Sequence, residues 1–461
     1  MRLTLVLALV FLAGCRSAAP RPAPLAAPLS GVIGVTEEQL SADYWVRRAG
    51  AARRVVLPAA AIAQQNRALL ERDSSMFDLE RLPARLSGDM VRGWVTRLSR
   101  APTRQLYDER GDSVTAAETA ALVVAVQPEA VPAEVAVRFG LVTRRTDLRT
   151  FPTARRVFSS RGGTDIDRWQ ETALFPGTPV AIVHESRDAR WWFVVSPNYA
   201  AWMPKTHVAL GHRVVVLGYA ASEPYLVVTG ARVRTVFTPE RPAVSEVELD
   251  MGVRLPLAQA RPQTVNGQNA YAAHVVLLPA RGNGDSLALI PTLVPRSADV
   301  AIGYPPLTAE GLLRQSFKFL GERYGWGHSY NGRDCSGFVG EVYRSFGVEL
   351  PRNTGDQATS PVLNRIAFTS ADSRAARLAA VRATHVGDMI HIPGHTMMVI
   401  GHVDGEPYII HDVTGVSYRG ADGAVVRVPL NGVSVTPLVT LASGPDATWV
   451  DRMTGIVRVR P

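Results

Sequence analysis

Cysteine is almost absent from this chain of 461 residues, which has only Cys15 and Cys335. Two cysteines exclude a disulfide-rich framework. Lysine is also scarce: two lysines stand beside 48 arginines, a bias that we attribute to GC-rich coding before function. The formal charge of +9 is spread along the chain without a basic block. We therefore expect no nucleic-acid partner, and affinity for acidic surfaces or polymers is an equally good interpretation.

The rest of the composition is that of a folded protein. Hydrophobic residues make up 46% of the chain and charged residues 20%, with 38 glycines and 32 prolines. These values exclude a collagen, a coiled coil and a wholly disordered chain. At roughly 150 residues per domain, the length predicts about three domains.

The N-terminus has the pattern of an export signal over residues 1–15. Arg2 precedes an apolar run over residues 3–12, and two small residues lead to Cys15. The run is shorter than the roughly 20 residues that span a bilayer. Leu12-Ala-Gly-Cys15 resembles the lipobox of bacterial lipoproteins, which implies that Cys15 is lipidated. An ordinary signal peptide with an incidental cysteine is the alternative.

Residues 16–32, rich in alanine and proline, predict an extended tether that reaches up to roughly 50 Å. Arg16 is not the aspartate typical of inner-membrane retention, so we expect an outer-membrane anchor in a Gram-negative cell. The predicted location is thus outside the cytoplasm, on the periplasmic face of a membrane. If Cys15 carries lipid, Cys335 is the one free thiol in a compartment that favours disulfides, which suggests a chemical role.

Residues 33–133 predict a mainly helical domain. A capping box at Thr36-Glu-Glu-Gln39 starts one helix that Gly50 ends, and Pro58 opens a second helix. No residue of this segment indicates a catalytic or binding role, and we expect the segment to pack against the other domains and to space them.

Residues 134–212 and 213–300 predict two small β-barrels, because short apolar runs alternate there with turn residues. The first resembles a bacterial SH3-like domain in Asp188-Ala-Arg-Trp191 and Tyr199-Ala-Ala-Trp202. The prediction of the second barrel depends only on the spacing of its expected strands. The aromatic residues are expected in the barrel cores, with a ligand groove shared with the next domain as the alternative.

Residues 301–461 contain the candidate catalytic residues. The apolar positions Cys335, Phe338, Val339, Val342 and Phe346 share one face of a helix that Asp334 can cap. Cys335 then lies in the first turn, where the partial positive charge of the helix N-terminus favours the thiolate. A cysteine nucleophile needs that placement.

A nucleophilic cysteine also needs a base and a group that orients the base. His395 begins an apolar strand and His411 ends the next one. A two-residue Asp404-Gly405 turn would put the two histidines on opposite faces, so we predict an odd-length loop centred on Val403 that pairs them directly. His385, His391 and His402 are expected to be structural.

Together, Asp334-Cys-Ser-Gly-Phe-Val339, Gly387-Asp388, Gly394-His395 and Ile410-His411 resemble the NlpC family of papain-like cysteine peptidases, which act on bacterial cell-wall peptides. Leu350-Pro-Arg352 followed by Gln357 resembles the next family segment. The resemblance implies an α+β multidomain protein: a helical N-terminal region, two small SH3-like β-barrels and a C-terminal papain-like α+β peptidase domain. Multidomain members cleave the γ-D-glutamyl–diamino acid bond of peptidoglycan stem peptides, and many require a free N-terminal L-Ala.

By this resemblance Cys335 is the nucleophile, His395 the base and His411 the orienting residue. The oxyanion would be held by the backbone N–H of Cys335 and a second donor that the sequence does not identify. Substrate contacts are implied for Tyr324, Asp334 and Ser336 of this domain and for Tyr199 of the first barrel. Two departures from the family, His328 in place of a glycine and one residue fewer between Tyr324 and Cys335, affect the substrate pocket more than the triad.

Three functions remain open: this hydrolase, a non-catalytic wall-binding lipoprotein, and a papain-like amidase or acyltransferase. We expect a monomer that binds peptidoglycan or muropeptides without a cofactor or a metal. His391 and His395 are four residues apart as in a zinc motif, but Pro393-Gly394 between them excludes a shared helix.

Overall fold

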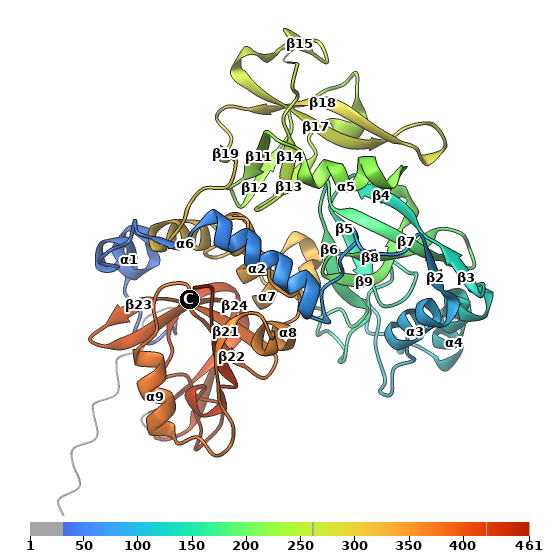
Figure 1. Cartoon of the computed structure of the whole chain (residues 1–461). Helices are drawn as coiled ribbons and strands as arrows, with labels where there is room; N and C mark the ends of the chain where they lie inside the picture. Colours follow the sequence, from blue (N-terminus) through green and yellow to red (C-terminus); the bar gives the residue numbers. More distant parts are fainter. Residues whose placement is uncertain (1–30, 261, 421, 461) are drawn as a thin grey trace, which may run out of the picture.

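The computed structural model describes residues 31–260, 262–420 and 422–460. The predicted signal, the lipidation site Cys15 and nearly all of the tether lie outside them. The described chain forms a first barrel, a second β region above it and a C-terminal α+β domain, with an N-terminal segment spread over the others (Figure 1). The predicted fold class is confirmed in its SH3-type and peptidase parts.

The first barrel is a seven-stranded antiparallel sheet of residues 138–211 in the order β10-β4-β7-β8-β9-β5-β6. Trp192 lies on the inner face of the barrel and is buried in its core, as expected. Trp202 lies on the other face, where it is buried against Phe193 and the N-terminal segment. The strands are β4 (Arg138–Val142), β5 (Thr146–Arg149), β6 (Gln170–Leu174), β7 (Pro179–Glu185), β8 (Trp191–Ser196), β9 (Tyr199–Pro204) and β10 (Val208–Gly211).

The second region opens with a helix that the sequence analysis did not predict, α5 (Arg213–Ala221). Its described strands form small sheets of two or three strands in place of one continuous barrel sheet. They are β11 (Tyr225–Val228), β12 (Arg232–Arg234), β13 (Glu248–Asp250), β14 (Arg254–Pro256), β15 (Thr264–Val265), β16 (Gln268–Asn269), β17 (Ala273–Arg281), β18 (Leu287–Pro295) and β19 (Val300–Ile302). Apolar residues of both β regions share one buried cluster, so the two pack as a unit.

The C-terminal domain packs helices against a six-stranded sheet of order β21-β26-β22-β23-β24-β25. Helix α7 (Cys335–Arg344) lies on β23 and β24, and Phe338, Val339 and Val342 fill the interface. The other elements are β20 (Leu307–Thr308), α6 (Ala309–Phe317), α8 (Thr354–Thr359), β21 (Asn364–Ala367), α9 (Arg374–Arg382), β22 (Met389–Ile392), β23 (His395–Val403), β24 (Glu406–Arg419), β25 (Val425–Pro437) and β26 (Gly455–Arg458).

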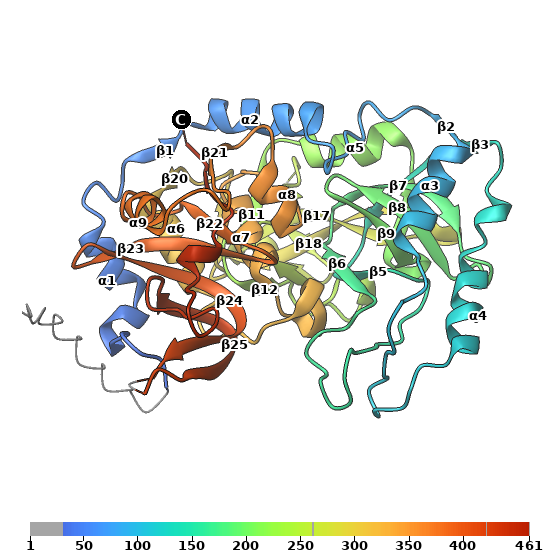
Figure 2. The same cartoon turned by 90° about the horizontal axis from the view of Figure 1, so that it is seen from below.

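The N-terminal segment is divided between two cores. Its first part packs on the C-terminal domain: Trp45, Leu57 and Ile62 join the cluster that holds Phe338. Strand β1 pairs with β20, and α2 runs along the edge of the molecule towards the first barrel (Figure 2). The elements of this part are α1 (Ala42–Arg48), β1 (Val55–Leu57) and α2 (Ala59–Arg72).

The second part packs on the first barrel, where Leu86, Val91 and Val95 join its core. Its elements are β2 (Arg85–Ser87), α3 (Gly88–Leu98), α4 (Ala116–Val126) and β3 (Glu134–Ala136). The segment 33–133 therefore has no core of its own, because its amphipathic helices bury their apolar faces against two different neighbours.

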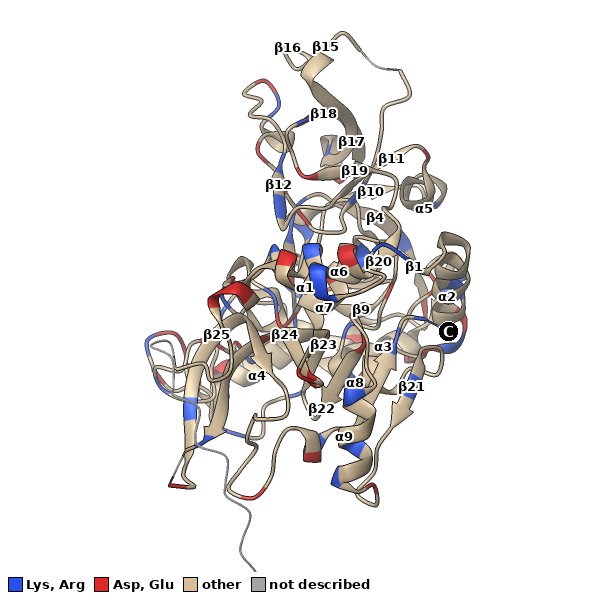
Figure 3. Cartoon of the chain, turned by 90° about the vertical axis from the view of Figure 1, so that its left-hand side faces the viewer, with Lys and Arg blue, Asp and Glu red and all other residues tan. Residues whose placement is uncertain are grey.

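Acidic and basic residues are interspersed along the chain in the view of Figure 3. Among the described residues, no helix is both long enough and apolar enough to cross a membrane.

Candidate active site

Cys335 is the first residue of α7, as predicted. Asp334 caps the helix by accepting the Gly337 N–H at 2.8 Å. The thiol is 6% exposed, lies 3.6 Å from the Thr354 hydroxyl and meets the backbone amide of Thr396, at the start of β23. The helix thus holds the sulfur against the strand that begins with His395.

His395 and His411 are adjacent, with His395 Nε2 2.9 Å from His411 Nδ1. His411 Nε2 in turn lies 3.1 Å from the Thr436 hydroxyl on β25. The Trp449 ring packs edge-on against both imidazoles, with centroids 5.4 and 5.6 Å away. Since His395 Nε2 is engaged by His411, Nδ1 is the nitrogen left for the thiol.

The register that brings the histidines together differs from the predicted one. The loop is the two-residue Asp404-Gly405 turn, not an odd-length loop, since Val403 pairs with Glu406. A bulge at Ile400 shifts the register by one residue, and Val399 pairs with Ile409. The bulge returns His395 and His411 to the same face, as diagonal neighbours rather than a directly opposed pair.

Burial controls the ionisation of the pair. It raises the pKa of the Cys335 thiol to about 11, with a further contribution from the negative charge of Asp334. It lowers the pKa of His395 to about 3 and places that of His411 well below its usual value. The expected stabilisation of the thiolate by the helix N-terminus is outweighed, and the buried site holds a neutral thiol and a neutral imidazole.

The Asp334 side chain is buried and accepts four hydrogen bonds. Its carboxylate accepts from Gly337 and Ser336 on one oxygen, and from the Gly327 amide (2.9 Å) and the Arg352 guanidinium (2.8 Å) on the other. Burial alone would raise its pKa, but Arg352 holds that pKa down to about 2. With four donors bound, Asp334 offers a substrate its negative charge more than a free lone pair.

Tyr324 and Tyr199 both interact electrostatically with Asp334. Tyr324 is 6% exposed, and burial together with Cys335 and Asp334 raises the pKa of its phenol, which therefore stays protonated. Tyr199 comes from β9 of the first barrel and donates to Glu171 at 2.5 Å, while Asp334 and Arg352 act on it electrostatically. The structure thus brings a residue of the first barrel to the site of the C-terminal domain.

Three residues of the site were not predicted as functional: Glu171, Arg352 and Thr436. Glu171 accepts from Tyr199 and Thr150 and keeps lone pairs free on both oxygens. Arg352 was noted only as part of a family segment. None of the three carries a local sequence signal for its role, because that role depends on contacts across the fold.

Asp412 follows His411 and has no exposed surface. Neither carboxyl oxygen has a hydrogen-bond partner by geometry, although the Val413 amide lies nearby. Burial, with Asp334 and Glu322 close, raises the pKa of Asp412 well above its usual value. The environment of Asp412 therefore opposes its ionisation.

A cavity of about 910 Å³ lies behind α7, on the face turned away from the sheet. Neither Cys335 nor His395 lines it, and its wall includes Thr172, Ser336 and Arg352. This cavity is separate from the reacting groups. Within the described residues no three His, Cys, Asp or Glu side chains are grouped as metal ligands.

Comparison with known proteins agrees with this geometry. Residues 321–434 match the NlpC/P60 family, and residues 156–204 match the SH3 domain of SH3b1 type. The γ-D-glutamyl-L-lysine dipeptidyl-peptidase of Bacillus cereus is 27% identical over 207 residues, which cover 42% of this chain and 55% of that protein. The Bacillus subtilis protein of the same name is 39% identical over 66 residues, covering 14% and 22%.

The chain thus spans about half the length of the first curated relative and about a fifth of the second. An NlpC/P60 endopeptidase from Photobacterium damselae subsp. piscicida has a similar fold, with a TM-score of 0.69 and 15% identity over 88% of this chain and 93% of that one. The C-terminal domain is therefore a peptidase domain of the NlpC/P60 family, whose members are cysteine peptidases, and it follows an SH3 domain of the SH3b1 type.

Proposed function

We propose that the protein is a cysteine endopeptidase that hydrolyses the γ-D-glutamyl–diamino acid bond of peptidoglycan stem peptides. The observation that carries the proposal is that Cys335, at the start of α7, meets the backbone of Thr396, next to His395, whose ring nitrogen lies 2.9 Å from that of His411. Further support comes from two relatives named γ-D-glutamyl-L-lysine dipeptidyl-peptidase.

The reaction follows from the atoms available. The Cys335 thiol gives its proton to His395 Nδ1 as the sulfur attacks the γ-carbonyl carbon of D-Glu. The backbone N–H of Cys335 stabilises the oxyanion, a contact typically worth about 3 kcal/mol. The C–N bond breaks, His395 returns the proton to the leaving amine, and a thioester remains.

Water completes the cycle. His395 takes a proton from water, the hydroxide attacks the thioester carbon, and the carboxylic acid and the thiol are released. His411 keeps the proton-bearing nitrogen of His395 directed away from the sulfur, because it accepts from Nε2. Since the resting pair is neutral, proton transfer and attack are expected to be concerted when substrate binds.

We propose that the substrate carries a free N-terminal L-Ala. Glu171 and Tyr199 reach the site from the first barrel, and Glu171 has lone pairs free for an ammonium group. Asp334 adds a second negative charge beside Tyr199. Two carboxylates within one buried site favour a cation over an acetylated or peptide-extended amine.

The test is mass spectrometry after incubation with L-Ala-γ-D-Glu-diaminopimelate and, separately, with intact peptidoglycan. A Cys335→Ala variant is the control for each. Release of L-Ala-D-Glu from the tripeptide alone is the expected result and indicates trimming of free muropeptides. Release from intact wall would indicate an open groove and wall remodelling, and no release above the control would refute the proposed hydrolase.

We also propose that the protein is exported as a lipoprotein anchored through Cys15, on the evidence of the Leu12-Ala-Gly-Cys15 pattern. Intact-mass measurement of protein from the membrane fraction should show a diacylglycerol-sized addition. A Cys15→Ser variant should lack this mass and leave the membrane fraction. Equal membrane association of both variants would refute the anchor.

A further inference from the structure

His328 combines an unfavourable backbone conformation with a buried side chain. It lies in a short turn of residues 326–331 with φ +66°, a conformation that residues other than glycine adopt rarely. Its side chain is nevertheless buried, with 4% of the residue exposed. Gly337 of α7 makes room for the ring, since a Cβ there would lie 2.6 Å from His328 Cε1.

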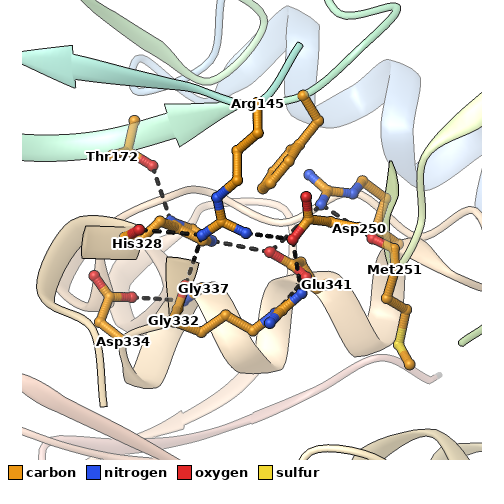
Figure 4. Close-up of polar contacts among 12 residues, drawn as sticks. Arg145, Thr172, Asp250, Met251, His328, Gly332, Asp334, Gly337 and Glu341 are labelled. Atoms are coloured by element: carbon orange, nitrogen blue, oxygen red, sulfur yellow. Dashed lines mark hydrogen bonds and ion pairs between the residues drawn. The ribbon is translucent and has the colours of Figure 1, made fainter. Parts of the chain in front are cut away.

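Both ring nitrogens of His328 are bonded. Nε2 lies 3.0 Å from Glu341 Oε1, and Nδ1 lies 3.1 Å from an Arg352 terminal nitrogen. The ring also packs edge-on against Phe175 of the first barrel at 5.6 Å. Figure 4 shows His328 between Thr172 of the barrel and Glu341 of α7, beside Gly337 and Asp334.

These contacts fix the state of the imidazole. A guanidinium can only donate, so His328 Nδ1 must accept from Arg352. The proton then resides on Nε2 and is donated to Glu341, whose other oxygen accepts from Arg333 at 2.5 Å. Burial, reinforced by the positive charge of Arg352, lowers the pKa of His328 to about 4, in agreement with a neutral ring.

Arg352 carries the effect of His328 to the active site. Its other donors bind Asp334 at 2.8 Å, Ser336 at 2.9 Å and Thr172 of the first barrel at 2.5 Å. One guanidinium therefore joins the cap of the catalytic helix, a predicted substrate contact and the first barrel. His328 Nδ1 is a further acceptor for this guanidinium.

We infer that His328 is a positioning residue: as a neutral acceptor held by Glu341, it fixes Arg352 and, through this guanidinium, holds Asp334 and Ser336 in register with the first barrel. The charged groups around the ring are Glu341, Arg352 and Asp334, and Arg145 of the barrel donates to its backbone carbonyl. The kinetic consequence rests on the proposed function, whereas the protonation state does not.

The kinetic test compares three variants with the wild type on L-Ala-γ-D-Glu-diaminopimelate. His328→Gly accepts the positive φ but removes the acceptor, and it should raise KM about tenfold with kcat within twofold, because His328 and Arg352 form no hydrogen bond with Cys335, His395 or His411. His328→Gln supplies one acceptor and one donor and should recover to within about threefold of the wild-type KM. Asn331→Gly is the matched control, since Asn331 has φ +57° in the same turn and an exposed side chain.

Unchanged KM in His328→Gly, or equal losses in His328→Gly and Asn331→Gly, would overturn the inference. So would failure of His328→Gln to improve on His328→Gly, because an amide should replace the lost acceptor.

The second test is independent of activity. Long-range 15N NMR of histidine-labelled protein reports which ring nitrogen carries the proton, and comparison with His328→Gln assigns the signal. The expected result is the Nε2–H tautomer with no titration above pH 5. An Nδ1–H tautomer, or a protonated ring at pH 7, would overturn the inference. If the wild type cleaves no substrate, the proposed function fails, and the NMR result alone decides the role of His328.

Discussion

Replacing Thr436 with valine tests whether the Thr436 hydroxyl fixes the tautomer of His411. Thr436 has no exposed surface, and its hydroxyl, 3.1 Å from His411 Nε2, is the partner that the structure gives this nitrogen. Valine has nearly the same shape and removes only the acceptor. If His395 receives the thiol proton on Nδ1, both imidazoles must carry their protons on Nε2, and His411 must donate to Thr436.

The structure sets the size of the effect. A buried N–H that loses its partner costs about 1–3 kcal/mol. His411 can avoid this cost by moving its proton to Nδ1, but that nitrogen then opposes the N–H of His395. His395 must in turn move its proton to Nδ1 and can no longer accept from the thiol. Either way the competent tautomer becomes less stable by that amount, so kcat should fall by about 5- to 150-fold.

The assay is steady-state cleavage of L-Ala-γ-D-Glu-diaminopimelate by Thr436→Val, with Thr436→Ser as the control that keeps the hydroxyl. KM should change little, because Thr436 does not reach the substrate. Thr436→Ser should remain within about threefold of the wild type. A Thr436→Val enzyme with wild-type kcat would refute this chain of proton positions, and equal losses in both variants would assign the effect to packing.

Four further outcomes are expected. Glu171→Gln should raise KM for the free-amine tripeptide about tenfold with little change in kcat, and an equal KM would refute amine recognition by Glu171. Trp45→Ala should lower the free energy of unfolding by about 3–5 kcal/mol in urea denaturation, because the ring is fully buried against Gly401 and Tyr408. The control Val214→Ala, at an exposed position, should change it by less than about 0.5 kcal/mol. Burial lowers the pKa of His391 to about 4, so the unfolded chain takes up a proton on this residue at a higher pH than the folded chain does. The free energy of unfolding should therefore fall as the pH drops from about 6.5 towards 4, by up to about 3 kcal/mol from this residue. An unchanged pH dependence of stability in His391→Asn would contradict this. Asp412→Asn should raise Tm at pH 7, because it removes a carboxyl group whose ionisation the buried site opposes, and a lower Tm would refute this reasoning.

Local signals predicted the helix of the nucleophile. Its apolar spacing and its Asp334 cap are properties of adjacent residues, and α7 begins at Cys335 as expected. Strands β7, β8 and β9 of the first barrel were predicted for the same reason, since alternation and turn residues are recognisable within short windows, whereas β5, β6 and β10 were missed.

Features set across the fold were not predictable in this way. The bulge at Ile400 follows from packing on both faces of the sheet, so the loop was predicted wrongly although the adjacent histidines were identified. The expectation that the helix N-terminus favours the thiolate was wrong, because the pKa of Cys335 depends on burial by other parts of the chain. Glu171, from another domain, could be found only once the barrel was in place.

The pairing of β1 with β20 also bears on how such a protein can change over evolutionary time. The segment that carries Trp45 enters the core of the C-terminal domain, more than 200 residues away in the sequence. Domains joined only by linkers can be exchanged or duplicated as cassettes, whereas a cut at residue 301 would separate this core from its N-terminal part. Recombination that preserves the fold must therefore carry both ends of the chain together, and the β regions between them behave as an insertion within the peptidase rather than as a preceding module.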